Sequence, residues 1–443
     1  MKILLLQLAK MGDLLQTAPL LRRLQDAHLG AEVHLLHSAM FASVAARLGA
    51  DRCLPVDLDS TIGADSNLRQ GTHAFLVQLQ QAGYGLVVNP SSGRLAGQIA
   101  GAVGAPVLGY AGQDPGALAW LYFALSFIRS RRLATLNLTD IYRQLLPQAG
   151  PSAPVRQRTS WGQCSLIGFQ LASRNRKRQW PLAQFAALAD RLVESGTRIR
   201  LLGSEAEAAH ATSFLKQVGN PERVENLVGR TDVPGLFTAV KECDLLVTGD
   251  TGTMHVAAAL DVPVTAVFLG PASPWETLAW SEHAEGFWPE RSAVDCYPCL
   301  ETAACDNGFA CHGSVNAEDI WSRRAGNAAR FATTARDALG QVLTPNGGLV
   351  DDEKMGMAYR AWACEYFLDA PCEASPLPEL LVERLRRELR LWERLQPRQM
   401  SPEHLAPSFE LLLPLVYFTH LCRHLQTDAP DLLGDWLRTA AGL

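Results

Sequence analysis

The sequence predicts an α/β protein made of two doubly wound domains and an all-helical C-terminal extension. Two blocks of the chain alternate short apolar runs with amphipathic stretches, which is typical of a parallel sheet covered by helices on both faces. A segment rich in Pro, Gly, Ser and Arg at residues 147–163 separates the blocks, and from about residue 355 the strand pattern disappears. We therefore place domains at 1–150, 164–345 and 355–443, the first two being Rossmann-like units that face a cleft.

The first block contains strands and helices in alternation. Apolar runs predict strands at 2–8, 31–38, 52–57 and 84–92. Helical spacing predicts helices at 14–27, 40–49 and 72–83. Arg22 and Arg23 are expected to face outward on the first helix, and Gly49 is expected to end the second.

The second block repeats this alternation. Strands are predicted at 164–172, 197–204, 244–249 and 263–270. Helices are predicted at 181–196, 205–219, 233–243 and 254–261. No short-period repeat is visible, which argues against a solenoid.

The C-terminal extension has a strongly helical pattern. In the segment 380–395, Leu381, Leu385, Leu389 and Trp392 form one apolar stripe. The polar face mixes Glu with Arg, so a packing or oligomerisation element is favoured over a membrane-surface helix. Homo-oligomerisation through this segment and peripheral membrane association both stay open.

Charge and hydropathy exclude several classes of protein. The net charge of −5 gives no electrostatic footprint for nucleic acid. No uninterrupted run of about 18 apolar residues is present to span a membrane. Gln7, Lys10 and Asp13 interrupt the N-terminal apolar run, so it is not expected to be a signal peptide. A cytoplasmic location follows, with reduced cysteines available for metal binding.

The segment TGDTGTMHVAAAL at 248–260 changes from turn residues to an apolar helix directly after a predicted strand. Such a turn presents unpaired backbone N–H groups and the positive end of a helix dipole. It therefore predicts a seat for phosphate or another anion.

Four segments together resemble glycosyltransferase family nine, the ADP-heptose:lipopolysaccharide heptosyltransferases and their relatives. They are LQLAKMGDLLQTAPLLRRL, LASRNRKRQWPLAQFAALADRL, LVGRTDVPGLFTAVKECDLLVTGDTGTMHVAAALDVPVTAVFLGPASP and CYPCLETAACDNGFACHG. The resemblance covers roughly residues 1–325, and the third segment carries it most specifically. It implies a GT-B fold, with the acceptor on the first domain and the nucleotide sugar mainly on the second.

By this resemblance the turn at 248–255 holds the diphosphate of the donor. Thr251 and Gly252 would offer backbone N–H groups, and Asp250 would accept hydrogen bonds from sugar hydroxyls. His255 belongs to the same motif. Taken alone, the turn favours Asp250 as a helix N-cap and His255 as a core residue, and the flanking block shifts the prediction to a donor site.

The family's catalytic aspartate matches Asp13, which follows Gly12 in the turn after the first strand. Inverting transfer needs a base for the acceptor hydroxyl and a cation for the departing diphosphate. Asp13 is the predicted base, with an N-cap role as the alternative. Arg178 is the predicted cation, and a one-residue shift in register would give that role to Lys177. Arg174 and Arg176 are expected to be solvated.

Weaker matches surround this centre. The resemblance places Ser173 against the donor and Thr231 near the nucleobase, and Glu205 is a candidate for the ribose hydroxyls. In the first domain NPSSGR departs from the usual family segment near the acceptor. Arg94 is either a contact for an anionic acceptor or a plain surface residue.

Four cysteines, Cys296, Cys299, Cys305 and Cys311, lie close together after the donor motif. The CYPC pair can bind one metal ion, and the next two cysteines can complete a tetrahedral site. Bacterial protein heptosyltransferases resemble this chain in using four such cysteines for iron, but thiolates alone do not separate iron from zinc. The metal would be structural, no catalytic cofactor is expected, and four ordinary thiols are the alternative.

The sequence thus predicts an inverting glycosyltransferase that moves heptose, or a similar sugar, from ADP-heptose to lipopolysaccharide core or another surface glycan. The inner-membrane face is the expected place for such an acceptor. A protein O-heptosyltransferase and a non-catalytic GT-B scaffold are the alternatives, and a nucleotide-sugar epimerase is a weaker one because it would not need the GD turn.

Overall fold

The computed structural model describes residues 1–57, 66–91, 93–114, 135–147, 161–323, 329–346 and 348–349, with eight single residues: Ala117, Trp120, Leu121, Ala124, Glu353, Met357, Arg360 and Leu368. The predicted helical segment 380–395 lies outside these residues. No helix in the described part of the chain is long and apolar enough to cross a membrane.

The first sheet has five parallel strands in the order β3-β2-β1-β4-β5. They are β1 (Lys2–Gln7), β2 (Glu32–Ser38), β3 (Arg52–Val56), β4 (Leu86–Asn89) and β5 (Val107–Gly109). The helices of this part are α1 (Met11–Gln16), α2 (Ala18–Ala27), α3 (Ala42–Ala45), α5 (Ser66–Gln81), α6 (Arg94–Ala102) and α8 (Leu138–Arg143), and η1 (Ala39–Phe41) is a 3₁₀ turn. Alternate residues of β1 belong to two different buried clusters, one on each face. This explains why β1 reads as a continuous apolar run.

The second sheet has eight strands in the order β13-β12-β11-β10-β9-β6-β7-β8. The parallel ones are β6 (Leu166–Gln170), β7 (Arg198–Leu202), β8 (Val224–Asn226), β9 (Leu245–Gly249), β10 (Val264–Val267) and β11 (Ala284–Pro289). β12 (Ala329–Arg336) and β13 (Gln341–Pro345) extend the sheet as antiparallel strands. The sequence patterns predicted four of these eight strands.

The helices of the second part are α9 (Leu182–Glu194), α10 (Ala208–Leu215), α11 (Val233–Lys241), α12 (Gly252–Ala259), α13 (Pro274–Thr277) and α14 (Ala317–Ser322). Four of them, α9 to α12, lie within or close to the predicted segments, whereas α13 and α14 were not predicted. The 3₁₀ turns are η2 (Trp161–Gln163), η3 (Arg176–Arg178), η4 (Glu205–Glu207), η5 (Pro221–Arg223) and η6 (Ala310–Gly313).

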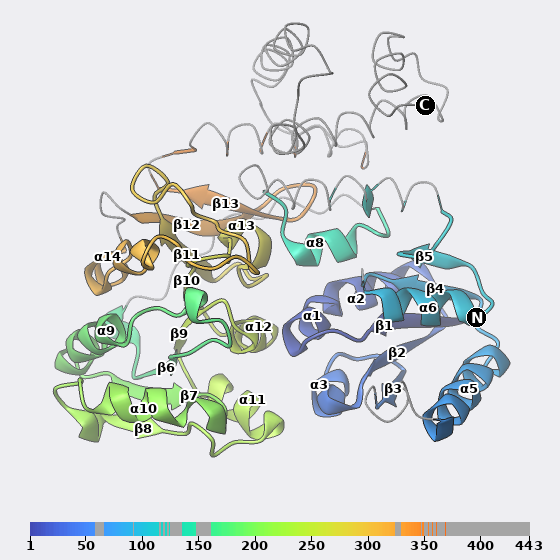
Figure 1. Cartoon of the computed structure of the whole chain (residues 1–443), viewed down its shortest axis with the longest axis horizontal. Coiled ribbons are helices and arrows are strands. Elements are labelled where there is room, and N and C mark those ends of the chain that lie inside the picture. Colours follow the sequence, from blue (N-terminus) through green and yellow to red (C-terminus); the bar gives the residue numbers. More distant parts are fainter. Residues whose placement is uncertain are drawn as a thin grey trace, which may run out of the picture.

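Both sheets reverse their strand order next to the first strand of the unit, between β1 and β4 and between β6 and β9. In doubly wound sheets, ligands bind outside the carboxyl ends of the strands at such switch points. Figure 1 shows the two sheets side by side, with α1 of the first against α12 of the second. The switch points therefore meet at the junction of the two sheets.

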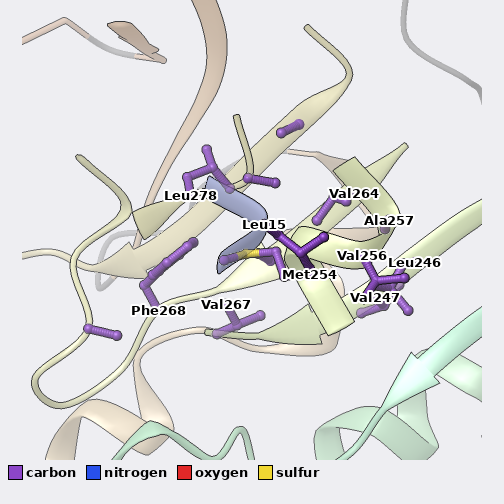
Figure 2. Close-up of a cluster of buried hydrophobic side chains, with 14 of the residues drawn as sticks. Leu15, Leu246, Val247, Met254, Val256, Ala257, Val264, Val267, Phe268 and Leu278 are labelled. Atoms are coloured by element: carbon purple, nitrogen blue, oxygen red, sulfur yellow. The ribbon is translucent and has the colours of Figure 1, made fainter. Parts of the chain in front are cut away.

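Apolar side chains next to this junction connect the first sheet unit to the second. Leu15 of α1 is buried in the same hydrophobic cluster as Met254 of α12, Phe268 and Leu278 (Figure 2). Burial of side chains of this size contributes about 1.5–3 kcal/mol each relative to exposure. The cluster consequently helps to hold α1 against the second sheet.

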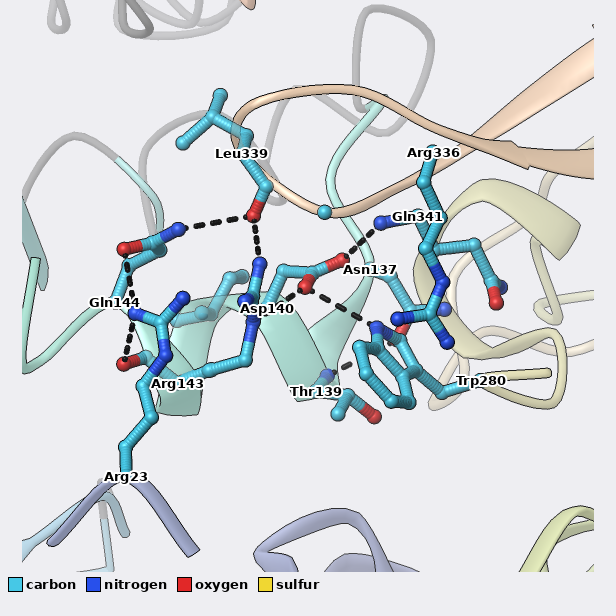
Figure 3. Close-up of polar contacts among 12 residues, drawn as sticks. Arg23, Asn137, Thr139, Asp140, Arg143, Gln144, Trp280, Arg336, Leu339 and Gln341 are labelled. Atoms are coloured by element: carbon cyan, nitrogen blue, oxygen red, sulfur yellow. Dashed lines mark hydrogen bonds and ion pairs between the residues drawn. The ribbon is translucent and has the colours of Figure 1, made fainter. Parts of the chain in front are cut away.

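Polar contacts from α8 make a second connection between the halves (Figure 3). The carboxylate of Asp140 is fully buried and accepts from Nε1 of Trp280 at 3.1 Å and from the backbone N–H of Gln341 at 2.7 Å. Nδ2 of Asn137 donates to the carbonyl of Leu278 at 2.9 Å. These bonds fix α8, and with it Tyr142, relative to the second sheet.

Two predictions for the first helix were wrong. The segment 14–27 is not one helix, because α1 ends and α2 begins at Thr17, where Pro19 near the start of α2 cannot donate an intrahelical hydrogen bond. Arg23 is not outward but 9% exposed, and its Nη1 donates to carbonyls of Arg143 and Leu146 and to Oε1 of Gln144. Burial lowers the pKa of Arg23 to about 10, and the nearby Arg143 adds to that effect.

Candidate active site

The turn after β1 lies directly against the start of α12. A Cβ added at Gly12 would stand 2.9 Å from Cδ2 of His255, and one added at Gly252 would stand 2.6 Å from Cε of Met11. Neither position has room for a side chain unless a neighbour moves. The two glycines therefore allow the GD turn and the diphosphate turn predicted from the sequence to meet.

Asp13 is the third residue of α1, whose N-cap is Lys10. Its Oδ2 accepts from the backbone N–H of Lys10 at 3.2 Å, and Oη of Tyr142 donates to Oδ1 at 3.5 Å. Burial raises the pKa of the Asp13 carboxyl above its usual value, and the contacts with Lys10 and Tyr142 oppose the rise. A half-buried carboxylate with a raised pKa in this position is chemically suited to accept a proton.

Arg178 projects from η3, the turn after β6, and pairs with two carboxylates. Nη1 lies 2.5 Å from Oδ2 of Asp250, and Nη2 lies 2.5 Å from Oε2 of Glu301. Burial by itself would lower the pKa of the guanidinium, but the two carboxylates outweigh it and raise the pKa above its usual value. The buried Nε–H has no hydrogen-bond partner among the described residues. The guanidinium also has N–H groups on Nη1 and Nη2 beyond the two that pair with these carboxylates, and its side chain is 25% exposed.

Asp250 and Thr251 form the turn between β9 and α12. Thr251, not Asp250, is the N-cap of α12, so the N-cap alternative for Asp250 is wrong. The Asp250 side chain is 8% exposed, and burial raises its pKa while Arg178 opposes the rise. The hydroxyls of Thr248 and Thr251 lie 2.9 Å apart, and Oγ1 of Thr253 donates to Oε1 of Gln170 at 2.9 Å. These bonds fix the turn that presents the first N–H groups of α12.

Lys177 faces away from this turn and holds the cysteine-rich segment. Its Nζ donates to the backbone carbonyls of Leu300, Glu301 and Ala303 at 2.7, 2.9 and 2.8 Å. These three bonds use all three donors of the ammonium group. In this arrangement Arg178, rather than Lys177, has a donor available to a phosphate.

His255 is 7% exposed and lies between the two halves of the molecule. Its Nε2 lies 3.1 Å from Nε2 of Gln16 in α1. Burial lowers the pKa of His255 to about 4, so the ring is neutral at pH 7. These contacts match the alternative that His255 is a core residue, and they make it a support for Gly12.

The remaining predicted donor contacts lie at the ends of neighbouring strands. Ser173 follows β6, is half-buried and accepts at its carbonyl from Nε2 of Gln179 at 2.7 Å. Glu205 follows β7, is exposed, and lies against Gly229, which has a φ of +72°. Thr231 is half-buried just before α11. All three stand on the carboxyl side of the second sheet, where a nucleotide would bind.

The four cysteines are gathered by the segment after β11. The side-chain amide of Asn307 donates to Sγ of Cys296 at 3.6 Å, and the backbone N–H of Phe309 donates to Sγ of Cys305 at 3.3 Å. Burial raises the pKa of the Cys311 thiol, the other three cysteines add to the rise, and a backbone hydrogen bond from Gly270 opposes it. No set of three or more His, Cys, Asp or Glu residues in the described chain is placed to hold a metal ion.

Lys10 was not predicted as a site residue from the sequence. Lys10 is exposed at the N-cap of α1, within electrostatic reach of Asp13, Asp250 and Glu301. It places a cation of the first domain beside the predicted phosphate turn of the second. A basic residue two positions before Gly12 of the GD turn was the available signal. Arg94, by contrast, is exposed at the start of α6.

These features define a GT-B-like protein. It has two Rossmann-like sheets, with an acidic residue after the first strand of one and a basic turn beside the N-terminus of an α-helix in the other. Residues 128–305 match the model of glycosyltransferase family 9 (heptosyltransferase), which confirms the predicted resemblance over this part of the chain. A lipopolysaccharide heptosyltransferase 2 of Salmonella typhimurium is 35% identical over 112 residues, which is 25% of this chain and 32% of that protein. Three further relatives are also named heptosyltransferase 2, and across these four proteins the matched region covers 28% to 49% of the relative's length.

Two comparisons extend over more of the chain. A lipopolysaccharide heptosyltransferase 1 of Pseudomonas aeruginosa is 26% identical over 328 residues, covering 68% of this chain and 86% of that protein. The structure of E. coli heptosyltransferase WaaC with ADP superposes with a TM-score of 0.54 at 19% identity, covering 73% of this chain and 98% of that one. The second comparison establishes a shared fold.

Proposed function

We propose that this protein is an inverting glycosyltransferase that transfers heptose, or a similar sugar, from a nucleotide-diphosphate sugar. The observation that carries the proposal is Arg178, a half-buried cation paired with Asp250 beside the start of α12, at the junction that also holds Asp13. ADP-heptose is the proposed donor, since the matched relatives are named heptosyltransferases and the superposed WaaC structure contains ADP.

In the proposed reaction Asp13 takes the proton of the acceptor hydroxyl as that oxygen attacks the anomeric carbon. The bond from the anomeric carbon to the diphosphate breaks on the opposite face, which inverts the configuration. Tyr142 keeps the carboxylate oriented through its hydroxyl. A positioned general base typically contributes about 10²–10⁴-fold in rate.

The departing diphosphate gains negative charge and needs fixed positive groups. Arg178 and Lys10 supply charge from the two domains, and Thr251 and Gly252 supply backbone N–H groups at the start of α12. Asp250 orients Arg178 through their ion pair and accepts from the sugar hydroxyls. Ser173, Glu205 and Thr231 extend the donor site toward the nucleoside.

The acceptor proposed is lipopolysaccharide core or another surface glycan at the cytoplasmic side of the inner membrane, because the relatives are lipopolysaccharide enzymes by name. Incubation with ADP-heptose and a heptose-free lipopolysaccharide core tests this, with mass spectrometry of the glycan and NMR of the new anomeric centre. A mass increase of one heptose with inverted configuration is expected. Heptose found only on protein would favour the O-heptosyltransferase alternative, and ADP-heptose left intact would favour a scaffold.

We further propose that Cys296, Cys299, Cys305 and Cys311 hold one structural iron or zinc ion. N–H groups of Asn307, Phe309 and Gly270 already point at sulfur atoms of this set, as they would for thiolate ligands. A bound ion would relieve repulsion among four thiolates and tie together a segment without regular structure. Elemental analysis of chelator-free protein should find close to one iron or zinc per chain, and protein without metal would refute the site.

A further inference from the structure

Glu301, in the cysteine-rich segment, forms an ion pair with Arg178, the predicted phosphate-binding residue. Its Oε2 stands 2.5 Å from Nη2 of Arg178, and Nδ2 of Asn175 donates to its Oε1 at 2.8 Å. Lys10 lies within electrostatic reach of the same carboxylate. An acidic side chain therefore pairs with Arg178, the residue to which the proposed function assigns the diphosphate.

The two acidic partners of Arg178 differ in how firmly they are held. The Asp250 side chain is 8% exposed and sits in the turn before α12, whereas the Glu301 side chain is 49% exposed at the rim. An exposed ion pair is worth little, because both groups are well solvated when they separate. A diphosphate carries more charge and can bind a guanidinium in bidentate fashion. It would displace Glu301 at little cost while Asp250 stays in place.

Lys177 sets how far Glu301 can move. Its ammonium binds the backbone carbonyls on both sides of the side chain, including that of Glu301 itself. The backbone of the segment is thus anchored to the residue next to Arg178 in the sequence. The Glu301 side chain can swing away without detachment of the segment.

We infer that Glu301 occupies the position of the donor diphosphate on Arg178 until the donor binds. Donor binding then replaces this one ion pair, while Lys177 keeps the cysteine-rich segment in place. The inference rests on the proposed function. It makes Glu301 a residue that tunes donor affinity: without its carboxylate, Arg178 is available to phosphate without competition.

The test is calorimetric titration of the full chain with ADP, GDP and UDP. Glu301→Gln keeps the size of the side chain and one oxygen acceptor for Nδ2 of Asn175, but removes the charge. It should tighten binding of the preferred nucleotide by about three- to fivefold, the range expected for loss of a partly exposed ion pair. Glu318→Gln is the matched control, because Glu318 is also a surface carboxylate 2.5 Å from an arginine, Arg191, and should change nothing.

A double-mutant cycle separates this mechanism from a general charge effect. In the background of Arg178→Ala, the change Glu301→Gln should no longer tighten binding. Unchanged or weaker binding by Glu301→Gln, with Arg178→Ala still impaired, would overturn the inference and leave the proposed function standing. Tightening of equal size with and without Arg178 would also overturn it. No nucleotide binding by any of these proteins, the unmodified chain included, would refute the proposed function together with the inference.

Discussion

Lys177 and Arg178 are neighbours of the same charge, and the structure gives them different tasks. The substitution Lys177→Met removes an ammonium group that donates to three backbone carbonyls, while it keeps an unbranched side chain of similar length. Because Lys177 is only 9% exposed, water replaces these bonds incompletely. We therefore expect loss of stability in the cysteine-rich segment and little direct loss of phosphate binding.

The size of this effect follows from the contacts. Hydrogen bonds to a charged group contribute about 1.5–3 kcal/mol, and the partly exposed carbonyls regain some hydration, so a total loss of about 2–3 kcal/mol is expected. For a domain of 150–250 residues this lowers Tm by about 4–12 °C. Arg178→Ala should instead weaken ADP binding about 10- to 100-fold through the loss of charge-assisted bonds, with a much smaller change in Tm.

Differential scanning calorimetry and ADP titration of both variants measure this division of roles. Arg174→Met is the control, since Arg174 is an exposed residue of the same loop and should affect neither quantity. If Lys177→Met melts like the unmodified protein but loses ADP affinity as far as Arg178→Ala does, Lys177 faces the phosphates and the assignment is refuted.

Four further predictions concern the candidate base, its pH dependence, the two glycines at the junction and the cysteine-rich segment. Asp13→Asn should reduce transfer by about 10²–10⁴-fold with ADP affinity unchanged, because an amide cannot take the hydroxyl proton; turnover within a few-fold of the unmodified enzyme would remove the base role. Since burial raises the Asp13 pKa, activity should fall as the pH drops through a value above the ordinary aspartate pKa of about 4, and a pH–rate profile measures this. Gly12→Ala should destabilise the protein by about 1–3 kcal/mol and reduce kcat, because the added methyl meets the buried His255 ring, whereas Gly252→Ala should cost less because it meets the flexible end of Met11; equal Tm and kcat losses would contradict this. Changing Cys296 and Cys299 to Ser should abolish bound metal and lower Tm more than it changes ADP affinity, which elemental analysis, calorimetry and titration together would show or exclude.

Strands such as β1 and β9 were predictable from the sequence, because runs of apolar residues fill most of their buried positions. β12 was not, since Arg330, Thr333 and Thr334 are buried within it. Arg330 is compensated by Glu290 and Glu353, and Thr334 donates to the carbonyl of Ser281, partners that only the tertiary structure supplies.

The turn motifs predicted where the candidate site lies, but not how its charges are shared. The GD and GDTGT turns each follow the strand next to a switch point, which is a local pattern visible in the sequence. The separate tasks of Lys177 and Arg178 depend on the docking of a segment more than 120 residues further along the chain. The approach of Lys10 to Asp250 and Glu301 likewise depends on contact between the two halves, which periodicity and spacing could not predict.

The central claim is that Asp13 and Arg178 act on one nucleotide-sugar donor at the junction of the two sheets. The most direct measurement is the rate of ADP release from ADP-heptose in the presence of a heptose-free lipopolysaccharide core, for the unmodified protein, Asp13→Asn and Arg178→Ala. We predict that the unmodified protein releases ADP in an acceptor-dependent way. Asp13→Asn should lose this release but keep its ADP affinity, and Arg178→Ala should lose both. ADP release that is unaffected by both substitutions, or no acceptor-dependent release at all, would contradict the account.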